Sequence, residues 1–123
     1  MDTLTAIVLF GHGSRDPAWR LAMDRVAQRM RELRPRCLVR CAFLELTEPD
    51  LSSVAQELHV QGVTRMAVFP MFLGMGRHAR EDLPVLVEQL RAQYPGMDIR
   101  LMASVGENPL VVDMLAHIAL ANA

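Results

Sequence analysis

Two histidines and one glutamate stand out because each lies in or just after an apolar run. His12 follows the run TAIVLF and lies between Gly11 and Gly13, and His78 lies in GMGRHARED, after the run RMAVFPMFL. Glu45 interrupts FLEL, where an acid is out of place on a buried strand. Two imidazoles and a carboxylate can bind a divalent transition metal, and the same groups can accept protons. The residue types therefore indicate metal or proton-transfer chemistry, provided that the fold brings them together.

Each of these residues, taken alone, also has an ordinary explanation. A loop histidine is usually solvated or structural, and a glutamate near a strand end is usually a surface acid. The remaining histidines are assigned such roles: His59 is placed late in a predicted helix, where a cation is favoured, and His117 in the last one. The functional interpretation of His12, Glu45 and His78 therefore depends on whether the fold brings these three residues together.

The hydrophobic pattern predicts four strands that alternate with four helices. The predicted strands span residues 5–10, 37–46, 65–73 and 98–105. The predicted helices run from Asp16 and Pro17 to about Arg34, from Thr47 or Glu48 to Gly62, from about Arg80 to Gln93, and from Asn108 and Pro109 to the C-terminus. This alternation predicts an α/β fold over residues 1–123, a single domain with a four-stranded parallel sheet and helices on both faces.

Right-handed crossovers and a flavodoxin-like strand order of 2-1-3-4 would put the first and third strands side by side. Ligands bind beyond the carboxyl ends of the strands at such a switch point. His12 and His78 would then flank it, with Glu45 at the end of the neighbouring second strand.

Composition limits the classes of partner. A hydrophobic content of 51% with 22% charged residues indicates a compact globular protein, and a net charge of −1 argues against nucleic-acid binding. No apolar run is long enough for a membrane span and the N-terminus lacks a basic leader, so we expect a cytoplasmic protein.

All 13 basic residues are arginine, which excludes lysine chemistry. Cys37 and Cys41 are expected to stay reduced, because four residues along a strand separate them by about 13 Å.

The segments GHGSRDPAW, AFLELTEPDL and FPMFLGMGRHAREDLP resemble the class II chelatases of the CbiX and SirB type, which insert a divalent metal into sirohydrochlorin. The resemblance covers nearly the whole chain, and the spacing of 33 residues from His12 to Glu45 and again to His78 fits it. The length is similar to that of the small, single-lobe members. The resemblance therefore implies a chelatase-like lobe that works as a homodimer, with a tetrapyrrole substrate and no organic cofactor.

The resemblance also implies roles for individual residues. His12 and His78 would ligate the metal and accept the two pyrrole protons, and Glu45 would be the third ligand or orient the site. The expected substrate-binding residues are Ser14, Arg15, Met75, Arg77 and Arg80. The arginines suit the carboxylates of sirohydrochlorin, and Met75 suits its apolar ring. Co²⁺ is the preferred metal, with Fe²⁺ and Ni²⁺ left open.

Two other functions use the same residues. A carrier of metal or tetrapyrrole would bind without turnover. A hydrolase would use Ser14 with a histidine, but GHGSRD lacks the G-x-S-x-G elbow of such enzymes. Multiple turnovers with sirohydrochlorin and metal distinguish a chelatase from a carrier.

Overall fold

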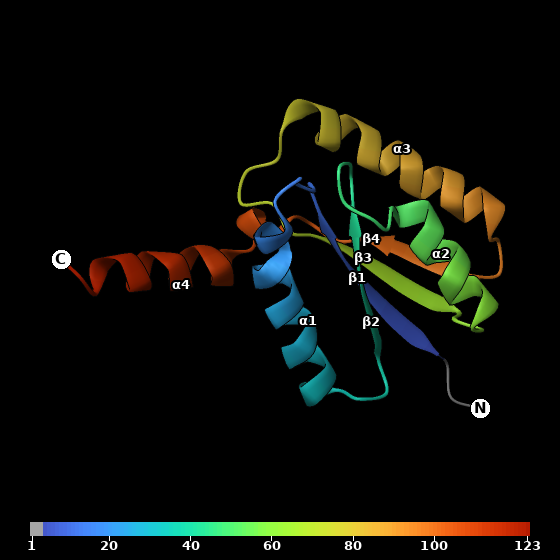
Figure 1. Cartoon of the computed structure of the whole chain (residues 1–123), viewed down its shortest axis with the longest axis horizontal. Helices are drawn as coiled ribbons and strands as arrows, with labels where there is room; N and C mark the ends of the chain where they lie inside the picture. The colour runs from blue at the N-terminus through green and yellow to red at the C-terminus, as the bar shows by residue number, and fades with distance from the viewer. Residues whose placement is uncertain (1–3) are drawn as a thin grey trace.

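The computed structural model describes residues 4–123, which form one parallel sheet with helices around it (Figure 1). The sheet consists of β1 (Thr5–Gly11), β2 (Leu38–Phe43), β3 (Arg65–Pro70) and β4 (Asp98–Leu101). The helices are α1 (Leu21–Leu33), α2 (Leu51–Val60), α3 (Arg77–Gln93) and α4 (Pro109–Leu120), with the short 3-10 helices η1 (Pro17–Arg20) and η2 (Val105–Glu107). The strand order is β2-β1-β3-β4 and all pairings are parallel, as the sequence predicted.

The sheet carries different layers on its two faces. Alternate residues of β1 such as Val8 and Phe10 pack under the apolar faces of α2 and α3 in the larger core. The intervening residue Leu9 packs with Met23 and Ala27 of α1 in a smaller core on the opposite face. Helices therefore lie on both faces, and the carboxyl ends of β1 and β3 lie side by side.

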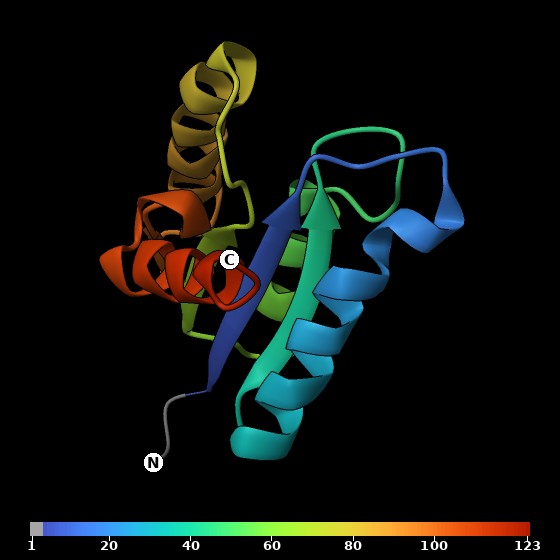
Figure 2. The ribbon, with the colours of Figure 1, turned by 90° about the vertical axis from the view of Figure 1, so that its left-hand side faces the viewer.

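Helix α4 lies apart from both layers. It extends away from the sheet in Figure 1 and has no buried residue. Figure 2 looks at the side of the sheet that carries α1 and shows α4 pointing out toward the viewer.

Several predicted boundaries were wrong at the carboxyl ends of the strands. The strands end at Phe43, Pro70 and Leu101, earlier than predicted. The second helix begins after Asp50 and not at Thr47 or Glu48, because the Asp50 carboxylate accepts a hydrogen bond from the Ser53 N–H at 2.8 Å and caps it. The prediction of Asp16 as a cap is confirmed, although the first turn is 3-10.

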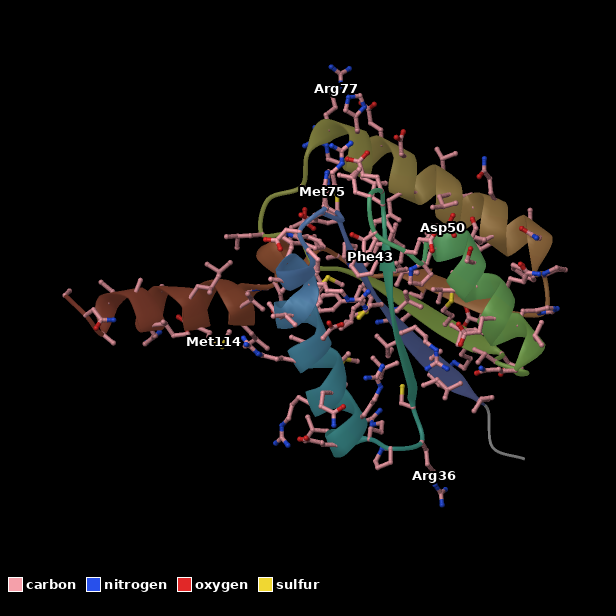
Figure 3. All side chains as sticks on the ribbon, in the orientation of Figure 1. Arg36, Phe43, Asp50, Met75, Arg77 and Met114 are labelled. Carbon is pink, nitrogen blue, oxygen red and sulfur yellow. The ribbon has the colours of Figure 1, made fainter. Side chains whose placement is uncertain are left out.

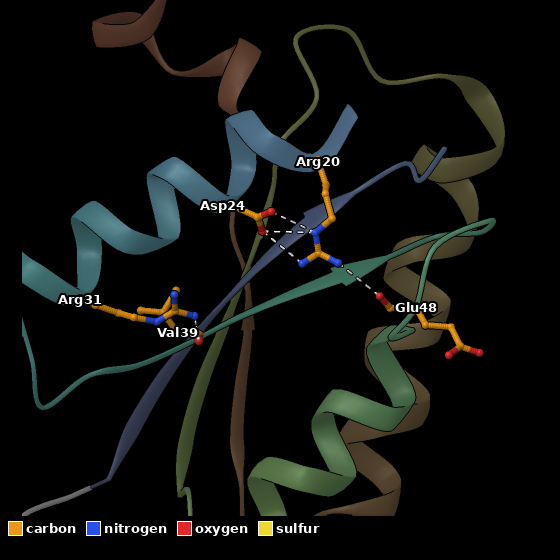
Figure 4. A network of polar contacts seen from close by, with 5 residues as sticks. All are labelled: Arg20, Asp24, Arg31, Val39 and Glu48. Atoms are coloured by element: carbon orange, nitrogen blue, oxygen red, sulfur yellow. Dashed lines mark hydrogen bonds and ion pairs between the residues drawn. The ribbon is translucent and has the colours of Figure 1, made fainter. Parts of the chain in front are cut away.

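The two outer strands each receive an arginine side chain. Arg31 of α1 donates a hydrogen bond to the Val39 carbonyl of β2 at 2.9 Å (Figure 4). Arg91 of α3 donates to the Ile99 carbonyl of β4, also at 2.9 Å. Each helix is thereby tied to the edge strand beside it.

In residues 4–123, no helix combines the length and the apolar character that crossing a bilayer requires.

Candidate functional site

The loops after β1 and β2 run side by side beyond the sheet. The Leu44 N–H donates to the Gly11 carbonyl at 2.9 Å, and the Glu45 N–H donates to the His12 carbonyl at 3.1 Å. The pairing of the two parallel strands thus continues past their ends. This continuation sets His12 and Glu45 next to each other, although 33 residues separate them in the sequence.

Gly13 makes this close approach possible. Its φ is +101°, and a Cβ atom at this position would lie 1.6 Å from the Glu45 carbonyl oxygen. The Ser14 N–H donates to the Thr47 hydroxyl oxygen at 2.9 Å, and that hydroxyl donates to the Ser14 carbonyl at 2.8 Å. The glycine is therefore required by contact between two backbones. By contrast, nothing lies within 4 Å of a Cβ built on Gly74.

His12 and Glu45 form the polar centre of the site. His12 Nε2 lies 3.1 Å from Glu45 Oε1, and the two side chains are 53% and 55% exposed. The pair is therefore within hydrogen-bonding distance and still open to a ligand from solvent. An imidazole nitrogen and a carboxylate oxygen are also two of the ligand types that Co²⁺, Fe²⁺ and Ni²⁺ accept.

An aromatic ring from the loop after β3 supports His12. The Phe72 ring lies 6.5 Å from the His12 ring, centroid to centroid, in a T-shaped arrangement with an interplanar angle of 83°. The backbone of Phe72 is held by Ser104, whose buried hydroxyl donates to the Phe72 carbonyl at 2.6 Å. The Gly106 N–H donates to the same carbonyl at 3.1 Å. Phe72 lies within the motif FPMFLGMGRHAREDLP, whereas no pattern in the sequence indicated Ser104.

His78 is not brought into this pair. Helix α3 begins at Arg77 and not near Arg80, so Arg77, His78 and Arg80 all lie in its first turn instead of a loop. His78 is exposed there. Among residues 4–123, no group of three or more His, Cys, Asp or Glu side chains lies close enough to hold a metal ion. The structure thus offers the two-residue His12–Glu45 pair in place of the predicted cluster of three.

The predicted substrate-binding residues fall into two groups. Met75 and Arg80 line a cavity of about 410 Å³ between the start of α3 and the carboxyl end of β4. Arg77 points away from the body of the molecule (Figure 3) and pairs with Glu81 at 3.0 Å.

On the other side of the His12–Glu45 pair, Arg15 is exposed. The Ser14 hydroxyl accepts a hydrogen bond from the Asp16 N–H at 3.1 Å, a contact that is typical of a serine in a turn before a helix.

A second cavity, of about 680 Å³, lies along the loop after β2. Its lining includes Glu45 and Leu46. Leu46 has a φ of +63°, a backbone conformation that is uncommon for a large apolar residue. It is also 55% exposed. Sequence reasoning missed Leu46 as a site residue, because FLEL is typical of a continuous strand.

Arg20 anchors this loop to α1 (Figure 4). Its guanidinium donates to both carboxylate oxygens of Asp24, and to the Glu48 carbonyl at 3.5 Å. It also lies 4.8 Å from the centre of the Phe43 ring. One side chain thereby links the helix, the end of β2 and the loop that carries Glu45.

Cysteine chemistry is unsupported in the described chain. Cys37 and Cys41 are both free thiols, as predicted. Burial, with a smaller contribution from Asp24, raises the pKa of the Cys41 thiol. The thiol therefore stays protonated at neutral pH and is a poor metal ligand.

The other two histidines have local partners. The His59 ring lies 4.7 Å from the Tyr94 ring, centroid to centroid. The His117 Nδ1 lies 2.9 Å from the Asp113 carbonyl one turn earlier in α4.

Comparison with known proteins identifies relatives across nearly the whole chain. A family model described as CbiX matches residues 6–120. The chain is 33% identical over 84 residues to the sirohydrochlorin cobaltochelatase of Methanopyrus kandleri, which covers 68% of this chain and 59% of that protein. It is 28% identical over 109 residues to the chloroplastic sirohydrochlorin ferrochelatase of Arabidopsis thaliana, which covers 89% and 48%. The chain thus spans about half to three-fifths of these relatives' length.

Solved structures share the fold. A protein of Marinobacter aquaeolei described as a cobalamin biosynthesis CbiX protein superposes with a TM-score of 0.77 at 33% identity, covering 97% of this chain and 99% of the other. The sirohydrochlorin chelatase SirB of Bacillus subtilis, solved in complex with cobalt, gives 0.76 at 27% identity, covering 92% of this chain and 48% of the other.

Proposed function

Because the chain belongs to the CbiX family, we propose that it is a chelatase that inserts a divalent metal into sirohydrochlorin. The observation that carries the proposal is the half-exposed His12–Glu45 pair, with Nε2 and Oε1 3.1 Å apart at the carboxyl edge of the sheet. Cobalt is our first choice of metal, with iron and nickel as the alternatives. Cobalamin or siroheme synthesis would use the product.

The reaction needs a metal site that releases its metal. The macrocycle gives up two N–H protons and takes up one M²⁺, so charge balances. An imidazole and a carboxylate leave most of the metal's coordination positions for ring nitrogens, whereas a complete protein cage would retain the ion. Two half-exposed ligands therefore suit delivery better than storage. We assign His12 and Glu45 to the incoming metal.

The reaction also needs proton acceptors. A neutral imidazole accepts a proton readily near neutral pH, and His12 can do so once the metal has left it. His78 is assigned as the second acceptor, acting on the ring from the start of α3. Its exposure fits a group that meets a large ligand from solvent.

Charged and apolar groups on the same edge suit the rest of the substrate. Arg80 lines the cavity beside Met75, and the first N–H groups of α3 have no side-chain cap. The guanidinium group of arginine and the free N–H groups at a helix N-terminus both bind carboxylates. Arg15, Arg77 and Ser14 are assigned to the periphery of the ring, and Met75 to its face.

We infer further that two copies form the active unit, and that the protein acts in the cytoplasm. The lobe corresponds to about half of the SirB chain, and its polar pair is open on one side. A second lobe would close that side.

Replacement of the proposed groups tests the assignment. His12→Ala and His78→Ala should each lower the rate of metal insertion by about 100-fold or more. Glu45→Gln should lower it by about 10-fold or more. The free energy of unfolding should change by less than about 0.5 kcal/mol, because all three side chains are exposed. His59→Ala is the matched control, because α2 runs back along the sheet and ends away from the site.

The assay follows the absorbance of sirohydrochlorin with Co²⁺, Fe²⁺ or Ni²⁺ at limiting protein. Many turnovers per chain support a chelatase. A change that stops at one equivalent per site supports a carrier, and wild-type rates in both histidine variants would remove the site assignment.

A further inference from the structure

The leucine between Glu45 and Thr47 has a strained backbone. Leu46 has a φ of +63°, and the Thr47 N–H donates to the Glu45 carbonyl at 2.7 Å across it. A three-residue γ-turn with a positive φ at its centre is rare and strained, although a glycine would adopt it without a steric penalty. Backbone strain of this kind clusters at functional sites. The turn therefore raises the question of what the leucine side chain does.

The residues on both sides of Leu46 are anchored to the loop after β1. The Glu45 carbonyl packs against the backbone at Gly13, where an added Cβ would lie 1.6 Å from its oxygen. The Thr47 hydroxyl exchanges two hydrogen bonds with the Ser14 backbone, at 2.9 and 2.8 Å. Figure 2 shows the two loops side by side beyond the strands. Leu46 is thus held between two fixed neighbours and is itself left open to solvent.

The Leu46 side chain contributes little to the fold. It is 55% exposed and belongs to neither of the two hydrophobic cores. Leu44, two residues earlier, packs against the larger core. Packing within the described part of the chain therefore does not account for a large apolar side chain at position 46.

The surroundings of Leu46 indicate which kind of ligand it would meet. Leu46 lines the cavity of about 680 Å³ together with Glu45, whose carboxylate lies 3.1 Å from His12 Nε2. Sites for small molecules typically enclose about 300–1,000 Å³. Glu48 and Asp50 line the same cavity, and carboxylates repel other anionic groups. This side of the site therefore suits an uncharged, apolar part of a ligand.

We propose that Leu46 is a substrate-contacting residue that packs on the face of the tetrapyrrole ring. The inference rests on the chelatase function proposed above and adds a residue to the same site. A ring centred on a metal held by His12 and Glu45 extends past the residue beside Glu45. The carboxylates of sirohydrochlorin lie on its rim, so its apolar surface is its face, and a leucine gains from burial there. Leu46 would meet the ring from the loop after β2, and Met75 from the loop before α3.

Binding of metal-free sirohydrochlorin to Leu46 variants tests the contact, with the absorbance of the ring as the signal. Leu46→Ala and Leu46→Gly should each raise the dissociation constant by about 5- to 10-fold, because the burial of about half a leucine side chain is lost. Leu46→Met keeps an apolar side chain of similar volume and should stay within about twofold of the wild type. Val60→Ala is the matched control, because Val60 is 78% exposed at the end of α2, and it should bind the ring like the wild type.

Urea unfolding of the same variants separates a contact with substrate from a structural role. Leu46→Gly relieves the strain at a positive φ, so its unfolding midpoint should equal or exceed that of the wild type. Leu46→Ala keeps the strained turn and removes a half-exposed side chain, so its midpoint should stay close to that of the wild type. A residue that only held the turn would lose stability and ring affinity together.

Three results would overturn the inference. The first is wild-type ring affinity in both Leu46→Ala and Leu46→Gly. The second is a lower urea midpoint that accompanies the loss of affinity in Leu46→Gly. The third is a wild-type protein that does not bind sirohydrochlorin, which also removes the chelatase. A wild-type protein that binds the ring but turns over none of the three metals refutes the chelatase alone, because the variants still decide the contact.

Discussion

Gly13→Ala is the sharpest test of how the two loops position the site. The added Cβ would lie 1.6 Å from the Glu45 carbonyl oxygen, where real contacts stay beyond 3.0 Å. The loops must therefore separate by roughly 1.5 Å. His12 Nε2 and Glu45 Oε1, now 3.1 Å apart, would lose their contact. A displacement of this size costs about 100-fold in rate when it affects reacting groups.

The same change has a predictable effect on stability. An alanine at φ +101° is strained by about 1–2 kcal/mol. Separation would also break the Glu45–His12 backbone hydrogen bond and the two between Ser14 and Thr47, at about 1 kcal/mol each. We expect the free energy of unfolding to fall by about 4–5 kcal/mol.

Urea unfolding and the metal-insertion assay measure the two effects on one sample. Gly74→Ala is the matched control, because a Cβ there meets nothing within 4 Å. It should change the free energy of unfolding by less than about 0.5 kcal/mol and leave the rate unchanged. Wild-type stability and rate in Gly13→Ala would refute the reasoning that contact between the loops builds the site.

Two further predictions concern the frame of the site. Hydrogen bonds from Ser53 hold the pKa of the Asp50 carboxyl below its usual value. The ionised carboxylate therefore stabilises the folded state fully at pH values above the usual carboxyl pKa. This stabilisation is lost as the pH falls through the lowered pKa of the folded state. Asp50→Ala should therefore cost about 1 kcal/mol in urea unfolding at pH 7 and much less at pH 2; an equal cost at both pH values would contradict this. Ser104→Ala leaves the buried Phe72 carbonyl without one donor and should lower the free energy of unfolding by about 1–3 kcal/mol, measured by thermal unfolding. Ser52→Ala is the control, because Ser52 is exposed and its replacement should have no measurable effect.

The strand order could be predicted from sequence because each strand is a distinct apolar run and each crossover contains a helix. The helix starts were less predictable, because Asp50 competes with Thr47 and Glu48 as a cap within four residues. Only the closing hydrogen bond to Ser53 decides between them.

The candidate site was predictable in its residue types and only in part in its geometry. The His12–Glu45 pair follows from register, which continues the β1–β2 pairing into the loops. The position of His78 depends on where α3 begins, and a glycine-rich loop gives little local signal for that. Leu46 and Ser104 owe their roles to backbone conformation and tertiary contact, and neither is encoded in a local pattern.

The arginines that reach the outer strands have a consequence for how this protein meets copies of itself. Arg31 and Arg91 occupy carbonyls of β2 and β4, and a guanidinium keeps its charge at every physiological pH. A charged side chain held on an edge strand discourages another strand from adding there. The joining of two copies edge to edge through their sheets is therefore disfavoured, and so is fibril growth by strand addition. Self-association is directed to the faces of the sheet and away from its edge strands.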